Sequence, residues 1–201
     1  MKAPVYLASQ SPRRRQLLDQ LGVWYQLLLP EADEDAEALE AMLPHEAPAT
    51  YVVRVTQLKL GAALLRRKRR GLPAAPVLCA DTTVALGRQI LGKPADVAEA
   101  HRMLLGLSGK THRVLTAVAI GSAGKRDQIL HVSHVTFAPM TDRQIRAYAA
   151  SGEPLGKAGA YGVQGQAAAF IERIAGSYSG IMGLPLFETA RLLRAFGVGF
   201  P

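Results

Sequence analysis

The chain has 201 residues, of which 49% are hydrophobic and 20% charged, a composition typical of a globular protein rather than a disordered one. Its single cysteine, Cys79, excludes an intrachain disulfide and a thiolate zinc cluster. No apolar stretch reaches the length of about 18 residues that a membrane span needs, and residues 1–15 lack the pattern of a signal peptide. We therefore expect a cytoplasmic protein that does not bind a membrane.

Apolar periodicity, capping residues and glycines predict the elements in chain order. They are a strand over 5–9, a helix over 11–22, a strand over 23–29, an acidic loop over 30–48 with one helical turn, a helix over 50–70, an apolar run over 76–86 that is broken at residues 81–83, a turn-rich loop or hairpin over 87–94, a helix over 96–107, strands over 111–121 and 128–138, a helix over 141–152, a glycine-rich segment over 155–183 and a helix over 185–196. Alternating strands and helices, followed by paired strands, predict an α/β fold with a mixed sheet. No linker interrupts the chain, so we treat residues 1–201 as a single domain.

The net charge of +8 favours an anionic partner, and the segment SQSPRRR over residues 9–15 is the first candidate to bind one. It stands where a strand end leads into a helix start. Unpaired backbone N–H groups at a helix start attract phosphate, serine hydroxyls add donors, and arginine offers paired donors for phosphate oxygens. Ordinary capping of a solvated helix explains the same residues equally well.

Asp81 is the second candidate, because it lies inside the apolar run VLCADTTVAL. A carboxylate in such a place is costly to bury unless it is paired or bound to a metal. It is therefore an active-site acid at a strand end, a turn-forming residue or the partner of an arginine. The acids Asp33, Glu34 and Asp35 could join it around Mg²⁺, although a solvated acidic loop is the simpler interpretation.

Other polar residues carry weaker signals. Lys93 lies in a glycine-flanked loop, GKP, from which its charge could reach a phosphate, or it lies in a solvated turn. The five histidines have no metal-binding spacing, so we assign them structural or surface roles. The run RRKRR over 66–70 could bind nucleic acid, but the chain is only 6% aromatic and a helix end favours positive charge. We therefore interpret it as a solvated helix end.

Taken in order, several blocks of the sequence resemble the Maf family of nucleoside triphosphate pyrophosphatases. The blocks are LASQSPRRRQLL, YVVRVTQLKL, ADTTVALGRQILGKP, MLLGLSGKTHRVLTAVAI and KAGAYGVQGQAAAFIERIAGSYSGIMGLPLFETARLL, and together they extend over about residues 4–196. The resemblance implies a two-lobed, inosine-triphosphatase-like α/β fold with its site in a cleft. It further implies cleavage between the α- and β-phosphates, with Mg²⁺ or Mn²⁺ as cofactor.

The resemblance also implies roles for individual residues. Asp81 matches the catalytic acid, and Lys93 is assigned to catalysis with it. The phosphate- and metal-handling positions are Ser9, Arg13, Arg14, Glu34, Lys59 and Lys93, with Glu34 and Asp81 as metal ligands. The positions tied to base selection are Arg13, Thr82 and Gln164. The pieces ADT and YGVQG resemble the branch that acts on dTTP and UTP, a function compatible with the removal of modified pyrimidine nucleotides. Three positions depart from the family pattern, namely Gln10, Leu58 and Gly156.

Two other functions stay open at this point. One is an enzyme of the same fold that acts on 7-methyl-GTP or a deaminated purine triphosphate. The other is a regulator of septum formation that acts by binding, for which RRKRR would be the contact with nucleic acid. Asp81, Lys93 and Gln164 favour an enzyme, so we expect a nucleoside triphosphate as the partner rather than nucleic acid. Proteins that resemble this chain are often homodimers, but no segment of the sequence demands a dimer.

Overall fold

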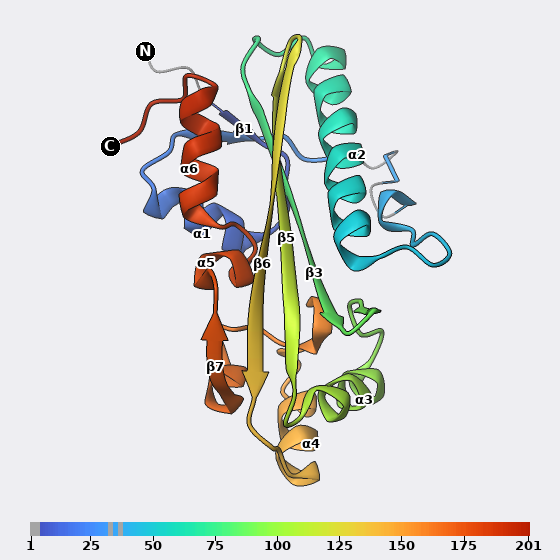
Figure 1. Ribbon diagram of the computed structural model, residues 1–201. Helices are drawn as coiled ribbons and strands as arrows, with labels where there is room; N and C mark the ends of the chain where they lie inside the picture. The colour runs from blue at the N-terminus through green and yellow to red at the C-terminus, as the bar shows by residue number, and fades with distance from the viewer. Residues whose placement is uncertain (1–4, 32–33, 36–37) are drawn as a thin grey trace.

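The computed structural model describes residues 5–31, 34–35 and 38–201 (Figure 1). Within these residues a seven-stranded sheet has the order β2-β1-β3-β5-β6-β7, and β4 is added to β3. The strands are β1 (Val5–Leu7), β2 (Tyr25–Leu27), β3 (Val77–Leu86), β4 (Gln89–Leu91), β5 (Thr111–Ser122), β6 (Lys125–Phe137) and β7 (Ile171–Ala175). The helices are α1 (Pro12–Gln20), α2 (Pro48–Arg69), α3 (Val97–Leu107), α4 (Asp142–Ala150), α5 (Tyr178–Met182) and α6 (Leu186–Ala195), with the 3₁₀ turns η1 (Ala38–Glu40), η2 (Ala158–Ala160) and η3 (Gln166–Phe170).

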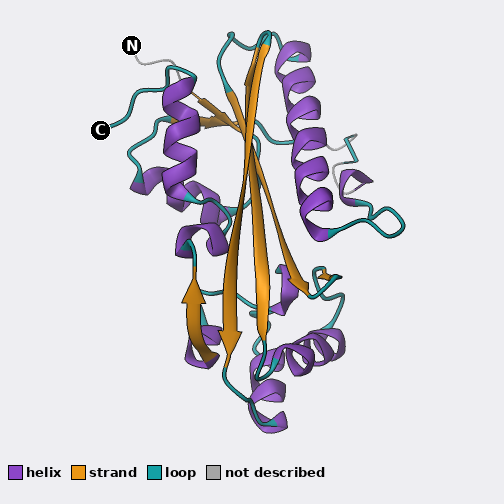
Figure 2. Cartoon of the chain, viewed as in Figure 1, coloured by secondary structure: helices purple, strands orange, loops and turns teal. Residues whose placement is uncertain are grey.

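The sheet is mixed, as the sequence predicts. β1 is parallel to both β2 and β3, whereas the remaining pairs are antiparallel. The long strands β5 and β6 run along most of the length of the molecule, and β3 lies beside them but ends short of α3 and α4 (Figures 1 and 2). α1, α2 and α6 lie around one end of these strands, and α3, α4 and β7 lie around the other (Figure 1). Two groups of elements thus share one continuous sheet, which is the two-lobed arrangement expected from the resemblance.

Local sequence explains where the helices begin. The carboxylate of Asp96 accepts a hydrogen bond from the backbone N–H of Glu99 at 2.7 Å and caps α3. Thr141 and Gln144 form a complete capping box at the start of α4. Both caps were predicted. α2 begins at Pro48, two residues earlier than expected, because proline is well suited to the first turn of a helix.

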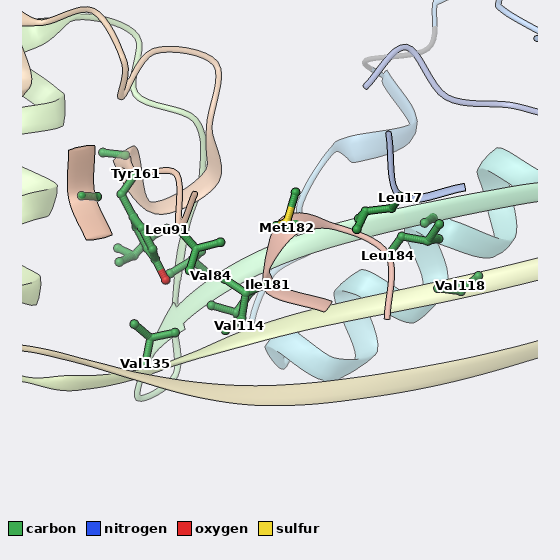
Figure 3. Packing of buried hydrophobic residues seen from close by; sticks show 14 of the residues in the cluster. Leu17, Val84, Leu91, Val114, Val118, Val135, Tyr161, Ile181, Met182 and Leu184 are labelled. Atoms are coloured by element: carbon green, nitrogen blue, oxygen red, sulfur yellow. The ribbon is translucent and has the colours of Figure 1, made fainter. Parts of the chain in front are cut away.

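The alternating side chains of β3 contact helices on both faces of the sheet. Cys79 and Ala85 belong to clusters that include residues of α2. Leu78 and Val84 belong to a larger cluster on the opposite face. Figure 3 shows that this larger cluster extends along the sheet, through residues of β3, β5, α1 and α5, among them Val84, Val114, Leu17, Ile181 and Met182. Asp81 therefore faces α2, and the next residue, Thr82, faces α1 and α5.

Two predictions need correction. Residues 77–86 form one uninterrupted strand rather than a run broken at 81–83, because Asp81, Thr82 and Thr83 pair with Ala117, Thr116 and Leu115 of β5. The segment over 155–183 holds β7 and α5, which its glycine content concealed. In the described part of the chain, no helix is long and apolar enough to cross a membrane.

Candidate active site

A split in the sheet creates the site. β1 pairs with β3 only at Val77 and Leu78, and β4 pairs with β3 only over residues 84–86. Among the strand pairs described, none covers this edge of β3 between residues 79 and 83. The edge opens onto a cleft with a volume of about 740 Å³. Ligands of α/β proteins commonly bind where neighbouring strands diverge in this way.

A chain of alternating charges crosses the cleft. The ammonium group of Lys59, from α2, lies 2.6 Å from Oδ1 of Asp81 and 2.7 Å from Oε1 of Glu40. The ammonium group of Lys93, from the loop after β4, lies 3.2 Å from Oε2 of Glu40. Asp81 is 8% exposed, so its carboxylate is stabilised by Lys59 rather than by bulk water. Asp81 is therefore a paired acid, but the expectation of an arginine partner is wrong, because Lys59 takes that place.

Glu40 corrects the assignment of Glu34. Glu34 pairs with Arg66 at 2.5 Å and with Arg69 at 3.0 Å, at the far end of α2. It therefore neutralises the basic helix end instead of joining Asp81, and among the described acids of this loop Glu40 is the one that reaches the cleft. Asp33 lies outside the described residues.

The same contacts revise the interpretation of RRKRR. Arg66 is only 5% exposed, and besides Glu34 it binds the backbone oxygen of Leu28 at 3.0 Å. Arg70 pairs with Glu31 at 2.7 Å. The run was predicted to be a solvated helix end, and this is wrong for Arg66. Three of its five cations bind the acidic segment, so the run serves in part to attach the loop that leads to Glu40.

Two arginines of α1 line the other side of the cleft. Nε of Arg13 donates to the backbone oxygen of Met182 at 3.3 Å, and Nε of Arg14 donates to that of Gly183 at 2.8 Å. Nη1 of Arg14 also donates to the hydroxyl of Ser9 at 3.2 Å. These carbonyl contacts fix the guanidinium groups without neutralising them. Arg13 and Arg14, from the segment predicted to bind phosphate, thus form one positively charged side of the cleft, which we call the arginine wall.

Thr82 lines the cleft and contacts the arginine wall. Its hydroxyl accepts from Nη2 of Arg14 at 3.3 Å and lies 3.0 Å from the hydroxyl of Thr116. Thr116 has one hydroxyl proton, which it donates to the backbone oxygen of Gly180 at 2.7 Å. Thr82 must therefore donate its proton to Thr116, and one of its two lone pairs accepts from Arg14. Thr82, which the resemblance assigns to base selection, thus helps to orient Arg14 in the cleft.

Gln164 lies at the cleft in a loop held by Glu153. The carboxylate of Glu153 accepts from the hydroxyl of Tyr148 at 2.8 Å and from the backbone N–H of Gln166 at 2.9 Å. A Cβ at Gly165 would clash with the carboxylate of Glu153, so a larger residue there would displace the side chain that holds the loop. The side chain of Gln164 itself is exposed and free to meet a ligand.

Burial, together with neighbouring positive charge, lowers the pKa values of several cationic side chains in the cleft. Desolvation lowers the pKa of Arg13, and desolvation followed by the neighbouring charge of Arg13 lowers the pKa of Lys157. Desolvation also lowers the pKa of Arg14, against the attraction of Asp81. Burial raises the pKa of Glu40, but Lys59 and Lys93 outweigh it, so the net shift is downward and Glu40 is ionised at neutral pH. Cations that are partly desolvated beside one another are stabilised by an anionic ligand such as a triphosphate.

The sequence segments that build this cleft match the sequence pattern of a known protein family. Residues 4–196 match the family described as Maf-like protein. The chain belongs to the Maf family.

Individual relatives in this family align with the chain over almost its whole length. A protein of Albidiferax ferrireducens is 74% identical over 193 residues, which are 96% of this chain and 96% of the relative. One from a Polaromonas species is 68% identical over 194 residues, again 96% of each chain. One from Cupriavidus metallidurans is 64% identical over 200 residues, 100% of each chain. All three are named dTTP/UTP pyrophosphatase.

Most of the residues predicted from the sequence come together in this Maf cleft. Those that line it are Ser9, Arg13, Arg14, Lys59, Asp81, Thr82, Lys93 and Gln164. Sequence reasoning missed Glu40, Tyr51 and Lys157, which line it too. Glu40 is one of several acids between residues 31 and 46, and no local signal distinguishes it from its neighbours. Lys157 and Tyr51 carry no motif of their own, and only the tertiary fold brings them to the cleft.

Proposed function

We propose that this protein is a nucleoside triphosphate pyrophosphatase that hydrolyses dTTP and UTP to the nucleoside monophosphate and diphosphate. The observation that carries the proposal is the placement of Asp81, Lys59, Glu40 and Lys93 in one cleft with the arginines of α1. Relatives at 64–74% identity, named for this activity, support the choice of substrate.

The cations of the cleft bind the phosphate chain. A nucleoside triphosphate carries up to about four negative charges, and Arg13, Arg14, Lys59 and Lys93 supply four positive charges. Charges that are already oriented stabilise the negative charge that develops as the bond between the α- and β-phosphates breaks. Arg14 is held by Ser9 and Thr82, so it does not have to be ordered when the substrate binds.

Asp81 is placed to accept the proton of the attacking water. Lys59 contacts its Oδ1, and in the described structure no protein group is recorded at Oδ2, which can therefore accept from water. The water oxygen forms a bond to phosphorus, the bond to the leaving phosphate oxygen breaks, and the proton passes to Asp81. The products are the nucleoside monophosphate and diphosphate.

The carboxylates also suit a divalent cation. Asp81 and Glu40 lie on either side of Lys59, and Mg²⁺ is usually held by one or two carboxylates together with substrate phosphates. Among the described residues no group of three or more His, Cys, Asp or Glu side chains could hold a metal alone, so the phosphates must complete its coordination. We propose that Asp81 and Glu40 hold Mg²⁺ or Mn²⁺, which when bound would further neutralise phosphate charge.

Gln164 supports the choice of a pyrimidine base. A side-chain amide offers both a donor and an acceptor, which match the alternating O4, N3–H and O2 edge of uracil or thymine. The amide of Gln164 is exposed and lines the cleft, so it is accessible to a base bound there. A site of this kind discriminates against a base whose edge leaves the amide unpaired.

A diphosphate-release assay over a nucleotide panel tests the proposal. dTTP, UTP, GTP and 7-methyl-GTP are each incubated with the protein in Mg²⁺, in Mn²⁺ and in excess chelator. We expect dTTP and UTP to be the best substrates, and we expect the chelator to abolish turnover without lowering the melting temperature. If 7-methyl-GTP is the best substrate, the base assignment is wrong. Full activity in chelator would remove the metal from the proposal, and no hydrolysis of any nucleotide would reject it altogether.

A further inference from the structure

The loop that carries Glu40 is attached to α2 by one arginine. Residues 38–46, which we call the 38–46 loop, extend from η1 to the turn before α2. Arg54 of α2 binds both carboxylate oxygens of Glu46, with Nε to Oε1 at 2.6 Å and Nη2 to Oε2 at 2.7 Å. Nη2 also donates to the backbone oxygen of Ala41 at 2.9 Å. One guanidinium thus joins both halves of the loop.

Few apolar contacts hold this loop. Residues 41–45 are all exposed, and Met42 and Leu43 are 62% and 53% exposed. The loop therefore gains little from hydrophobic burial, and its position must come from polar contacts. A two-point contact between guanidinium and carboxylate fixes orientation as well as distance. The pKa of Glu46 is lowered chiefly by its hydrogen bond with Arg54, so this contact is fully charged at neutral pH.

The same carboxylate closes a strained turn. The backbone N–H of Glu46 donates to the oxygen of Leu43 at 3.2 Å, and the N–H of Leu43 donates to Oε2 of Glu46 at 3.3 Å. Between them, His45 has φ of +58°, a conformation that costs a residue other than glycine about 1 kcal/mol or more. The turn persists because Glu46 bonds it from both sides while Arg54 holds Glu46.

The turn and Glu40 belong to one connected unit. Glu40 directly precedes Ala41, whose oxygen is held by Arg54. The hydroxyl of Tyr51 donates to the backbone oxygen of Glu40 at 3.0 Å. Lys59 then binds the carboxylate of Glu40. Three side chains of one helix, Tyr51, Arg54 and Lys59, therefore fix the backbone before the turn, the turn itself and the carboxylate in the cleft.

We propose that Arg54 is a positioning residue for the reaction: through Glu46 and Ala41 it fixes the 38–46 loop so that the carboxylate of Glu40 stands between Lys59 and Lys93. Arg54 acts through Glu40 and does not itself touch the phosphates. The inference rests on the proposed function, because the role of Glu40 in hydrolysis is what gives the attachment its effect on rate.

A comparison of variants in two backgrounds tests the role. Arg54→Gln removes the charge and the two-point contact, Arg54→Lys restores only the charge, and Arg146→Gln removes a matched exposed arginine–aspartate pair on α4 as a control. We expect Arg54→Gln to lower kcat about tenfold, Arg54→Lys to recover part of it, and Arg146→Gln to leave it unchanged. In a Glu40→Gln background, Arg54→Gln should cause no further loss. An equal loss in both backgrounds, or unchanged kcat for Arg54→Gln, would overturn the proposal.

A second measurement separates this inference from the proposed function. The methyl group of Met42 reports directly on the loop, and the other four of the five methionines provide internal references in an NMR spectrum. We expect Arg54→Gln to shift and sharpen the Met42 signal and leave the other methionine signals in place. If Glu40→Gln keeps full activity, Glu40 has no part in hydrolysis, and the positioning role of Arg54 fails with it. A Met42 signal that still responds to Arg54→Gln would then show only that Arg54 holds the loop. An unchanged Met42 signal would show that Arg54 does not hold the loop.

Discussion

Replacing Asp81 by asparagine removes the acid while preserving the shape of the side chain. Asp81 lies in the middle of β3, paired with Ala117, and its Oδ1 accepts from Lys59 at 2.6 Å. Asparagine can keep that one hydrogen bond through its own oxygen. It can neither take a proton from water nor contribute negative charge to a metal site. The variant therefore separates the chemistry of the carboxylate from its place in the fold.

The structure predicts a small effect on stability. Lys59 does not lose its charge partner, because Glu40 remains 2.7 Å away. The Asn oxygen still accepts from the charged Lys59 ammonium, so the variant loses only the attraction between two opposite charges, and that exchange costs on the order of 1 kcal/mol. For a chain of this length that corresponds to a fall in melting temperature of about 2–4 °C.

The expected effect on rate is much larger. Loss of a positioned general base lowers turnover by at least about 100-fold, which is about 2.7 kcal/mol in the activation free energy. The assay is diphosphate release from UTP at saturating substrate, with thermal unfolding measured on the same samples. Asp142→Asn is the matched control, because Asp142 is also ion-paired but lies on α4. Near-normal turnover by a folded Asp81→Asn protein would refute the assignment of Asp81 as the base.

Three further outcomes follow from the geometry. Gln164→Ala should reduce the preference for UTP over 7-methyl-GTP about tenfold in kcat/KM, and an unchanged ratio would exclude Gln164 from base selection. Gly159→Ala should destabilise the fold by about 1–3 kcal/mol in denaturant titration, because its φ is +71° and a new Cβ would lie 2.7 Å from Val84. Gly87→Ala is the control, because Gly87 has a similar φ with open space around it. An equal loss of stability in both variants would show that the clash with Val84 contributes nothing. Burial lowers the pKa of His112 to about 4 from 6.5, so only the unfolded chain binds a proton between these values and stability should fall by about 3 kcal/mol as the pH drops from 6.5 to 4. His112→Gln should remove that part of the pH dependence, and an identical slope in the variant would contradict it.

The local pattern of the sequence determined most of the secondary structure. The cap at Asp96, the capping box at Thr141 and the proline at the start of α1 specify helix starts through contacts within a few residues. The apolar run around Asp81 predicted a buried strand that carries an acid. Blocks of matching residues in order were sufficient to indicate the family. These features depend on neighbours in the chain, so a reader of the sequence can evaluate them.

Only the tertiary structure decided which acid and which partners make the site. Glu34 and Glu40 are six residues apart in the same acidic segment, yet Glu34 binds Arg66 at one end of α2 and Glu40 binds Lys59 near its middle. The choice depends on where the loop crosses a helix of 22 residues. Thr82 likewise became a support for Arg14 because a β-strand directs successive side chains to opposite faces. Long-range contacts of this kind have no signature in local composition, since residues with the same charge are equivalent until the fold brings one of them to a partner.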